Sequence, residues 1–171
     1  GMGSTCTAVV VQDDNLFFAH VGDSRGYLLR DHQLLQFTND HSKVAQMVLD
    51  GYITAEEAEV HPQRNVLLRS VGPKPEVAVD MGRLKLQSGD RILLCSDGLC
   101  GLVSDLEMMQ LIEDFGAEAT LDGLIKLAKE RGGHDNITVQ LVGYGAKKKG
   151  APATLAAPMT VGASPTMEMP M

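Results

Sequence analysis

Residues 91–99 read Arg-Ile-Leu-Leu-Cys-Ser-Asp-Gly-Leu, an apolar run that ends in an acidic turn. The run is typical of a buried β-strand, and it places Asp97 at the end of that strand. Residues 132–142 show the reverse order, in which Gly-Gly-His-Asp-Asn-Ile-Thr precedes the apolar run Val-Gln-Leu-Val. Asp135 therefore stands where a second strand begins. A carboxylate at the end of a buried strand is costly to desolvate unless something compensates its charge.

Each acidic turn has a plain structural interpretation when it is considered alone. Asp97 followed by glycine is a common turn pair, and Asp135 follows a double glycine that could end a helix. Together the turns favour a site, because junctions between strands and turns gather at one rim of a layered fold. Asp23, in a Gly-Asp-Ser-Arg turn, repeats the arrangement. Three acids at strand ends favour Mg²⁺ or Mn²⁺, since these hard cations prefer oxygen ligands.

Composition limits the classes of protein that this chain can belong to. The 171 residues fit one domain, and a hydrophobic fraction of 44% is enough for a core. The net charge of −7 argues against a nucleic-acid partner. No uncharged apolar stretch is long enough to span a bilayer. The sequence contains three cysteines, Cys6, Cys95 and Cys100, and their spacing matches no zinc or redox motif. Cys6 and Cys95 are expected in the core. A reducing, cytoplasmic location is the simplest inference.

The expected secondary structure changes along the chain. The first third predicts an antiparallel meander of strands over residues 6–11, 16–21, 27–30 and 34–37, with the first strand covered on both faces. The middle predicts helices at 43–49, after a Ser42 cap, and from Thr54 onward, an ambiguous segment at 65–71, and a strand within 76–86. The last third predicts a strand at 91–95, helices after Ser104 and around 121–128, and a strand at 137–143. Residues 146–171 lack periodicity and predict a disordered tail or linker.

Two segments near Asp23 keep two interpretations each. Arg25 could pair with a neighbouring acid inside the site, or it could form a surface ion pair that contributes little. Residues 38–42, Thr-Asn-Asp-His-Ser, could belong to the site, but they also make a good helix entry. His41, His61 and His134 have no zinc-like spacing and are interpreted as hydrogen-bonded loop residues.

Six short motifs occur in an order and spacing that resemble one family. They are Gly-Ser-Thr at 3–5, Gly-Asp-Ser-Arg at 22–25, Thr-Asn-Asp-His-Ser at 38–42, His-Pro-Gln-Arg-Asn at 61–65, Ser-Asp-Gly-Leu at 96–99 and Gly-His-Asp-Asn-Ile-Thr at 133–138. On these motifs the chain resembles the metal-dependent protein serine/threonine phosphatases of type 2C, in their bacterial form. The resemblance covers about residues 3–144.

The resemblance implies a fold and a reaction. The fold is α+β, a layered α-β-β-α sandwich with its N-terminal part missing, in a phosphatase domain over residues 1–145. The reaction is hydrolysis of phosphoserine and phosphothreonine in proteins by a metal-activated water, with two Mn²⁺ or Mg²⁺ ions per complete site. Phosphoproteins are then the substrates, and an opposing serine/threonine kinase is the partner that the family suggests.

The resemblance also implies a role for individual residues. Asp97 and Asp135 match the two C-terminal metal-binding aspartates, and Asp23 matches an acid that helps to hold a weaker third metal. Asn136 matches a residue that supports the ligands from behind. Gly98 and Arg25 are expected to support the site in the same way. No catalytic residue is expected in this chain beyond the metal ligands.

Two departures from the family pattern affect the expected activity. Gly101 stands where the family often has an aspartate for the third metal. The family's early Glu-Asp pair, its Asp-Gly-x-Gly-Gly motif and its phosphate-binding arginine do not occur. Two aspartates cannot fill the coordination spheres of two cations that take about six ligands each. We therefore expect the isolated chain to be weakly active or inactive.

Three hypotheses about the function remain. The first is that the chain is the C-terminal part of an active phosphatase. The second is a non-catalytic regulatory or binding module, and the third is an unrelated acidic metal-binding domain.

Overall fold

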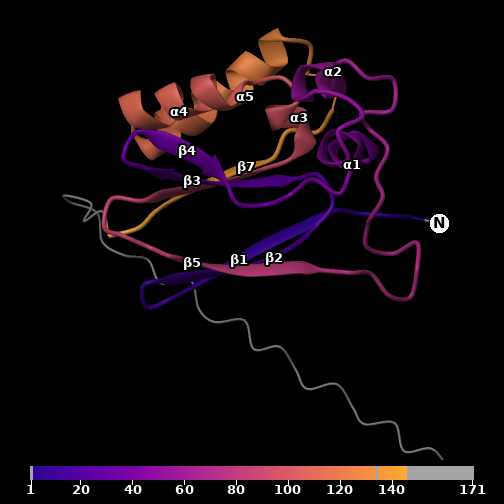
Figure 1. Cartoon of the computed structure of the whole chain (residues 1–171). Helices are drawn as coiled ribbons and strands as arrows, with labels where there is room; N and C mark the ends of the chain where they lie inside the picture. The colour runs from indigo at the N-terminus through magenta and orange to yellow at the C-terminus, as the bar shows by residue number, and fades with distance from the viewer. Residues whose placement is uncertain (1, 134, 146–171) are drawn as a thin grey trace, which may run out of the picture.

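Two antiparallel β-sheets packed face to face form the body of the protein (Figure 1). The computed structural model of the chain describes residues 2–133 and 135–145. The first sheet has the order β1-β2-β5, made of β1 (Cys6–Gln12), β2 (Asn15–Val21) and β5 (Asp80–Lys85). The second has the order β4-β3-β6-β7, made of β4 (Gln33–Gln36), β3 (Arg25–Arg30), β6 (Arg91–Cys95) and β7 (Val139–Gly143). The predicted tail at 146–171 lies outside the described residues.

Two helices, α4 (Asp105–Asp114) and α5 (Ala117–Glu130), cover the outer face of the second sheet (Figure 1). Helix α4 begins with the predicted capping box, in which Ser104 and Glu107 satisfy each other's backbone N–H groups. Apolar residues from both helices pack against the sheet, and these include the buried Met108 and Leu124. The two helices predicted for the last third are therefore confirmed.

The second sheet is buried on both faces, which explains the unbroken apolar run of β6. Leu93 belongs to the cluster that faces the helices, whereas Ile92 belongs to the cluster between the two sheets. Leu29 and Leu28 alternate in the same way on the neighbouring strand β3. Such a central strand has no polar face, so its sequence shows no alternation.

The first sheet is buried on one face only in the part of the chain that the structure describes. Its other face exposes Val10 (63%), which is opposite Phe17 (41%), and Met81 (79%), which is opposite Ala19, two residues further along β2. The prediction that the first strand is covered on both faces is therefore wrong for the described residues. Cys6 is exposed rather than in the core, for the same reason. The predicted α+β class, with two antiparallel sheets and flanking helices, is confirmed.

The chain crosses from the first sheet to the second at residues 22–24. Strand β2 pairs with β1 and β5, whereas β3 pairs with β4 and β6. The predicted meander of four strands is therefore wrong, because its second connection joins two sheets. Gly22 makes this crossing with a φ of 119°, and an added Cβ would lie 2.4 Å from Thr5 Cγ2. As a result, Asp23 lies at the rim where the sheets separate.

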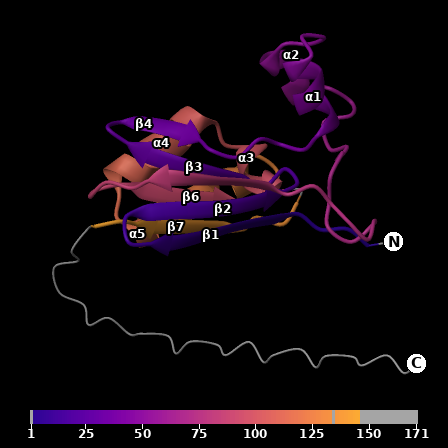
Figure 2. The ribbon, with the colours of Figure 1, turned by 60° about the horizontal axis from the view of Figure 1, so that its bottom comes forward.

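Two short helices stand at one end of the sandwich (Figure 2). They are α1 (Lys43–Leu49) and α2 (Ala55–Glu59), and both begin at the predicted caps. Ser42 Oγ accepts a hydrogen bond from the Ala45 N–H at 3.2 Å, and Thr54 forms a capping box with Glu57. No described helix is both long and apolar enough to cross a membrane.

The segment between α2 and β6 is less regular than the sequence suggests. Residues 65–71 form neither a helix nor a strand, and are held by isolated bridges from Leu67 to Ser42 and from Val71 to Ser4. The strand predicted within 76–86 is confirmed only over β5. The apolar residues Val77 and Val79, which alternate before β5, belong to no strand.

Candidate metal centre

The two acidic turns are joined directly, although they are far apart in the sequence. We call residues 96–99 the Asp97 turn and residues 135–138 the Asp135 turn. Ser96 Oγ donates a hydrogen bond to the Asn136 carbonyl oxygen and accepts one from the Thr138 N–H, both at 3.0 Å. The Ser96 N–H also donates to the Thr138 carbonyl oxygen at 3.0 Å. Three hydrogen bonds therefore fix the two aspartate-bearing segments against each other.

Gly98 allows this close approach. The residue is buried in the short helix α3 (Asp97–Cys100), and a Cβ at this position would lie only 2.5 Å from the Asn136 carbonyl oxygen. That distance is well inside van der Waals contact, and the neighbouring atom is backbone. Any other residue would force the two turns apart. The expected supporting role of Gly98 therefore has a physical basis in the spacing of the turns.

The two aspartates present carboxylates that no basic side chain neutralises in the part of the chain that the structure describes. Asp97 Oδ1 accepts a hydrogen bond from the Gly98 N–H at 2.9 Å, and Asp135 Oδ1 accepts one from the Asn136 N–H at 2.6 Å. Both side chains are exposed. Neither forms an ion pair with a basic side chain of residues 2–133 or 135–145. Each turn therefore holds one carboxylate oxygen by a backbone N–H group of its own.

Asp23 adds a third carboxyl group near Asp97. Burial, followed by the negative charge of Asp97, raises the pKa of Asp23 to about 6, and the Arg25 charge offsets only part of this increase. The rim where the sheets separate therefore carries more negative charge than nearby basic groups neutralise. Such a set of oxygen donors fits a hard divalent cation in its chemistry.

The described residues fit such a cation in ligand type but not in ligand number. Within residues 2–133 and 135–145, no group of three or more His, Cys, Asp or Glu side chains is arranged to hold a metal ion. The carboxyl groups of Asp23, Asp97 and Asp135 are therefore too few, by themselves, to fill the coordination sphere of such a cation. His134, interpreted from the sequence as a loop residue, lies outside the described residues.

Comparison with known proteins decides the family. The family model of protein phosphatase 2C matches residues 1–139. The chain belongs to the protein phosphatase 2C family. The resemblance drawn from the six sequence motifs is thereby confirmed.

Named bacterial members of the protein phosphatase 2C family are similar over most of this chain. Protein phosphatase PhpP of Streptococcus pneumoniae is 41% identical over 143 residues, which is 83% of this chain and 58% of the relative. Serine/threonine phosphatase stp of Listeria monocytogenes is 42% identical over 158 residues, which is 90% of this chain and 62% of the relative. The chain thus spans about three fifths of the length of the curated relatives that it matches.

Solved structures of this family share the fold. The Mycobacterium tuberculosis serine/threonine phosphatase PstP/Ppp superposes with a TM-score of 0.78 at 42% identity, over 82% of this chain and 59% of that chain. Stp1 from Staphylococcus aureus gives a TM-score of 0.81 at 40% identity, over 84% and 57%. The catalytic domain of PstP, solved in complex with two manganese ions, gives 0.71 at 40% identity, over 82% and 58%.

Arg25 pairs with a neighbouring acid, which resolves the two interpretations of this residue. Its Nε and Nη2 atoms donate to both carboxylate oxygens of Asp40, at distances between 2.7 and 3.1 Å. The Asp40 side chain is 14% exposed and that of Arg25 is 30% exposed, so the pair is largely shielded from water. Arg25 Nη1 also donates to the Tyr27 hydroxyl, which in turn donates to Asp105. The guanidinium therefore ties residues 38–42 to the second sheet.

A buried histidine pair holds the crossing at Gly22, and the sequence analysis missed half of it. His41 Nδ1 accepts a hydrogen bond from the Gly22 N–H at 3.1 Å, and its Nε2 lies 3.2 Å from Asp80 Oδ2. The His20 ring lies 4.8 Å from that of His41. Burial, followed by the charge of His41, lowers the pKa of His20. The interpretation of His41 as a hydrogen-bonded loop residue is confirmed, but no local signal indicated Asp80 or His20.

A cleft opens between β1 and β7 beside the acidic turns. It has a volume of about 250 Å³, and hydroxyl groups dominate its lining: Thr5, Thr7, Ser24, Leu94, Cys95, Ser96, Thr138 and Gln140. β1 and β7 are both outer strands of their sheets and run along the same side of the sandwich (Figure 2). Sequence patterns did not predict the cleft, because its two walls come from residues that are distant in the sequence.

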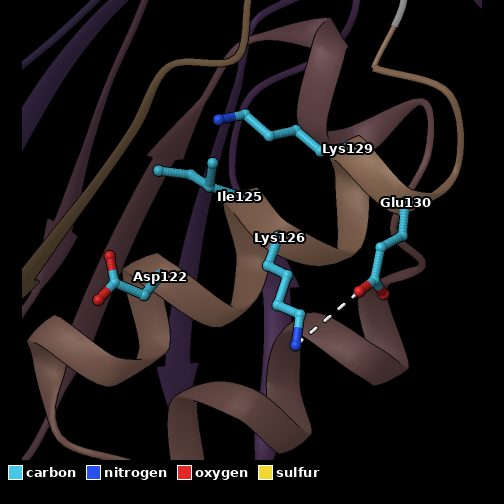
Figure 3. Close-up of a pocket in the computed structure, with 5 residues that line it drawn as sticks. All are labelled: Asp122, Ile125, Lys126, Lys129 and Glu130. Atoms are coloured by element: carbon cyan, nitrogen blue, oxygen red, sulfur yellow. Dashed lines mark ion pairs between the residues drawn. The ribbon is translucent and has the colours of Figure 1, made fainter.

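A larger hollow, of about 460 Å³, has no relation to this centre. The five residues that line it all project from α5, and Lys126 and Glu130 form an ion pair at 3.9 Å (Figure 3). Its lining contains no residue of the acidic turns. It is the solvated outer face of one helix.

Proposed function

We propose that this chain forms the C-terminal part of a metal-dependent enzyme that hydrolyses phosphoserine and phosphothreonine in proteins. The observation that carries the proposal is the direct joining of the Asp97 and Asp135 turns, whose carboxylates form no ion pair with a basic side chain within residues 2–133 and 135–145. Relatives at about 40% identity bear the names serine/threonine phosphatase and protein phosphatase, which supports the same activity here. Phosphoproteins are then the substrates, and a serine/threonine kinase would oppose the reaction.

Asp97 and Asp135 would hold divalent cations in this proposal, with Asp23 contributing at a weaker position. A neighbour structure with two manganese ions supports Mn²⁺, and Mg²⁺ has the same preference for oxygen ligands. When bound, such cations supply a water nucleophile at neutral pH and neutralise charge on the phosphoryl group. Gly101 has no side chain to offer, so we expect the third position to bind a cation poorly.

The protein's own residues act by positioning these carboxylates. Ser96 and Gly98 set the distance between the two turns, and the backbone N–H groups after each aspartate orient one carboxylate oxygen. Asn136 supplies one of these N–H groups and the carbonyl oxygen that Ser96 binds. Arg25 forms an ion pair with Asp40, which offsets part of the negative charge that this acid brings to the rim.

The remaining ligands would come from residues outside the 171-residue sequence. The described acids are too few for two cations that take about six ligands each. The cleft between β1 and β7 lies beside the acidic turns, and the outer edge of each strand can pair with a further strand. We propose that a segment carrying the family's Glu-Asp and Asp-Gly-x-Gly-Gly motifs docks there. The isolated chain is then weakly active or inactive.

The second candidate is a regulatory module without catalytic activity. The incomplete ligand set among the described residues favours it. The joined turns argue against it, because a module without a metal site has no need for an aspartate in each of two turns that hydrogen bonds hold together. The cytoplasmic location inferred from the cysteines stays a prediction under either candidate.

Hydrolysis of a phosphothreonine peptide with Mn²⁺ separates the two candidates. The chain should be nearly inactive alone and active when its N-terminus is extended by the segment of a bacterial relative that carries the two motifs. The same extended chain with Asp97→Asn and Asp135→Asn is the control and should lose the gain. A folded extended chain without activity would support the regulatory module, and full activity of the isolated chain would show that no further ligands are needed.

A further inference from the structure

We propose that Cys95 and Cys100 form an intrachain disulfide on oxidation, which closes a loop around Asp97. The sequence between them is Cys-Ser-Asp-Gly-Leu-Cys, so the bridge would enclose the whole Asp97 turn. The proposed bridge itself is independent of the proposed function. Its effect on metal binding, given below, rests on that function.

The local backbone brings the two thiols together. Cys95 is the last residue of β6, and Cys100 is the last residue of α3. The Leu99 and Cys100 N–H groups both point back to the Ser96 carbonyl oxygen, at 3.0 and 3.4 Å, and the Cys100 thiol lies 3.6 Å from the same oxygen. The turn therefore folds Cys100 back over the end of the strand, where it packs against the same core cluster to which Cys95 belongs.

The surroundings of the pair suit a reactive thiol next to a resolving one. Cys95 is 4% exposed and belongs to the core, whereas Cys100 is partly exposed to solvent. Arg25 lies directly opposite Cys95 in the pairing of β3 with β6. Because Cys100 is the more exposed thiol of the two, an oxidant reaches it first. Cys6 is exposed on β1 and serves as an internal comparison.

Formation of the disulfide requires an oxidant, and we propose that a hydroperoxide supplies it. The Cys100 sulfur attacks one peroxide oxygen, the O–O bond breaks, and the departing oxygen leaves as water with the thiol proton. The resulting sulfenic acid is then attacked by the Cys95 sulfur, so that an S–S bond forms and the S–O bond breaks. The second oxygen leaves as water with the Cys95 proton. Two thiols and one hydrogen peroxide thus give one disulfide and two waters.

The bridge would change the position of the Asp97 turn. A disulfide holds its two sulfur atoms at about 2 Å, much closer than two thiols in van der Waals contact, and so would draw the end of α3 toward β6. Ser96 lies inside the closed loop and carries the hydrogen bonds to the Asp135 turn. We expect the oxidised chain to bind Mn²⁺ more weakly than the reduced chain.

Peroxide treatment of the full chain carrying Cys6→Ser tests the bridge without reference to activity. No Lys or Arg occurs between Arg91 and Lys126, so both cysteines fall in one tryptic peptide. That peptide should become lighter by two hydrogen atoms, resist alkylation, and return to its first mass after treatment with dithiothreitol. The chain that also carries Cys100→Ser should keep Cys95 free for alkylation.

Two results would overturn the proposal. One is a peptide whose thiols both stay free at a peroxide concentration that oxidises Cys6 in the unsubstituted chain. The other is accumulation of sulfinic acid on Cys100 while Cys95 stays free. If Cys100→Ser proves unfolded by circular dichroism, Cys95→Ser gives the matching test, since Cys100 should then stop at sulfenic acid or a higher oxide. Mn²⁺ titration of the reduced and bridged forms tests the effect on the site separately.

Discussion

Ser96 Oγ donates a hydrogen bond to the carbonyl oxygen of Asn136, forty residues further along the chain. The same oxygen atom of Ser96 accepts from the Thr138 N–H. One hydroxyl group therefore satisfies two backbone groups of the Asp135 turn and fixes its distance from the Asp97 turn. This contact adds to the pairing of β6 with β7, in which Cys95 faces Val139, and we expect it to set the spacing of the two turns beyond the ends of those strands.

Ser96→Ala should loosen the centre. The substitution removes two hydrogen bonds and should lower the free energy of unfolding by about 1–2 kcal/mol. Mn²⁺ affinity should fall as well, since the two carboxylates lose their fixed distance. Urea unfolding and metal titration measure the two effects. Ser88→Ala is the control, because Ser88 is exposed and makes one long contact of 3.4 Å to Gly145. Equal behaviour of the two variants would contradict the account.

Gly98→Ala should separate the turns by steric overlap. The new Cβ would lie 2.5 Å from the Asn136 carbonyl oxygen, and overpacking of this kind costs about 1–3 kcal/mol. Gly123→Ala in α5 is the matched control, because its Cβ would meet only the flexible Leu111 side chain at 3.3 Å. The control should be neutral or slightly stabilising, since alanine favours a helix. A Gly98→Ala chain as stable as the control would show that the turns do not pack as described.

Local sequence patterns predicted the individual helices and strands of this fold better than they predicted which strands pair with one another. The capping boxes at Thr54 and Ser104 and the apolar run of β6 depend on neighbouring residues, so the sequence shows them directly. The change of sheet at Gly22 depends on which distant strand each hairpin pairs with. The exposure of Cys6 likewise depends on what covers β1. A local sequence pattern predicts neither the strand pairing nor the exposure of Cys6.

In the candidate site, too, local features were predictable from the sequence and contacts between distant segments were not. Asp97 and Asp135 were visible as acids at strand ends, because an acidic turn beside an apolar run is a local feature. The contact of His41 with Asp80 and the cleft between β1 and β7 were not visible. They arise where segments from different sheets meet, and only the packing of the two sheets brings those segments together.

Asp90 should make stability depend on acid pH. Burial alone would raise the pKa of this carboxyl group, but hydrogen bonds from Arg30 and the Gln87 N–H lower it below the ordinary value of 3.8. The depressed pKa stabilises the fold above the unfolded-state value, and this contribution is lost as the pH falls through the folded-state value. Urea unfolding between about pH 6 and pH 2 should therefore show a loss that Asp90→Asn reduces.

The control for this pH dependence is Asp14→Asn. Asp14 pairs with Lys85 at the surface, where an ion pair contributes little. Its acid unfolding curve should match that of the unsubstituted chain. If Asp90→Asn also left the curve unchanged, the Arg30 pair would have no part in acid stability.

Asp40→Asn should destabilise the rim of the sandwich. The substitution leaves the Arg25 guanidinium, which is 30% exposed, without its charged partner, and we expect a loss of about 2 kcal/mol in the free energy of unfolding. Arg25→Lys should not rescue the contact, because an ammonium cannot bind both carboxylate oxygens in the same fork. Thermal unfolding of the two variants checks this. A loss confined to Asp40→Asn would show that the fork geometry is unimportant.

Paramagnetic broadening by Mn²⁺ in the amide spectrum of the isolated chain tests the central claim most directly. At a low ratio of metal to protein, the signals of Gly98 and Asn136 should broaden first, while that of Lys126 on α5 stays sharp (Figure 3). The chain with Asp97→Asn and Asp135→Asn should lose this selective broadening and keep its fold. Broadening that persists in the double variant, or that centres on α5, would contradict a metal centre at the two joined turns.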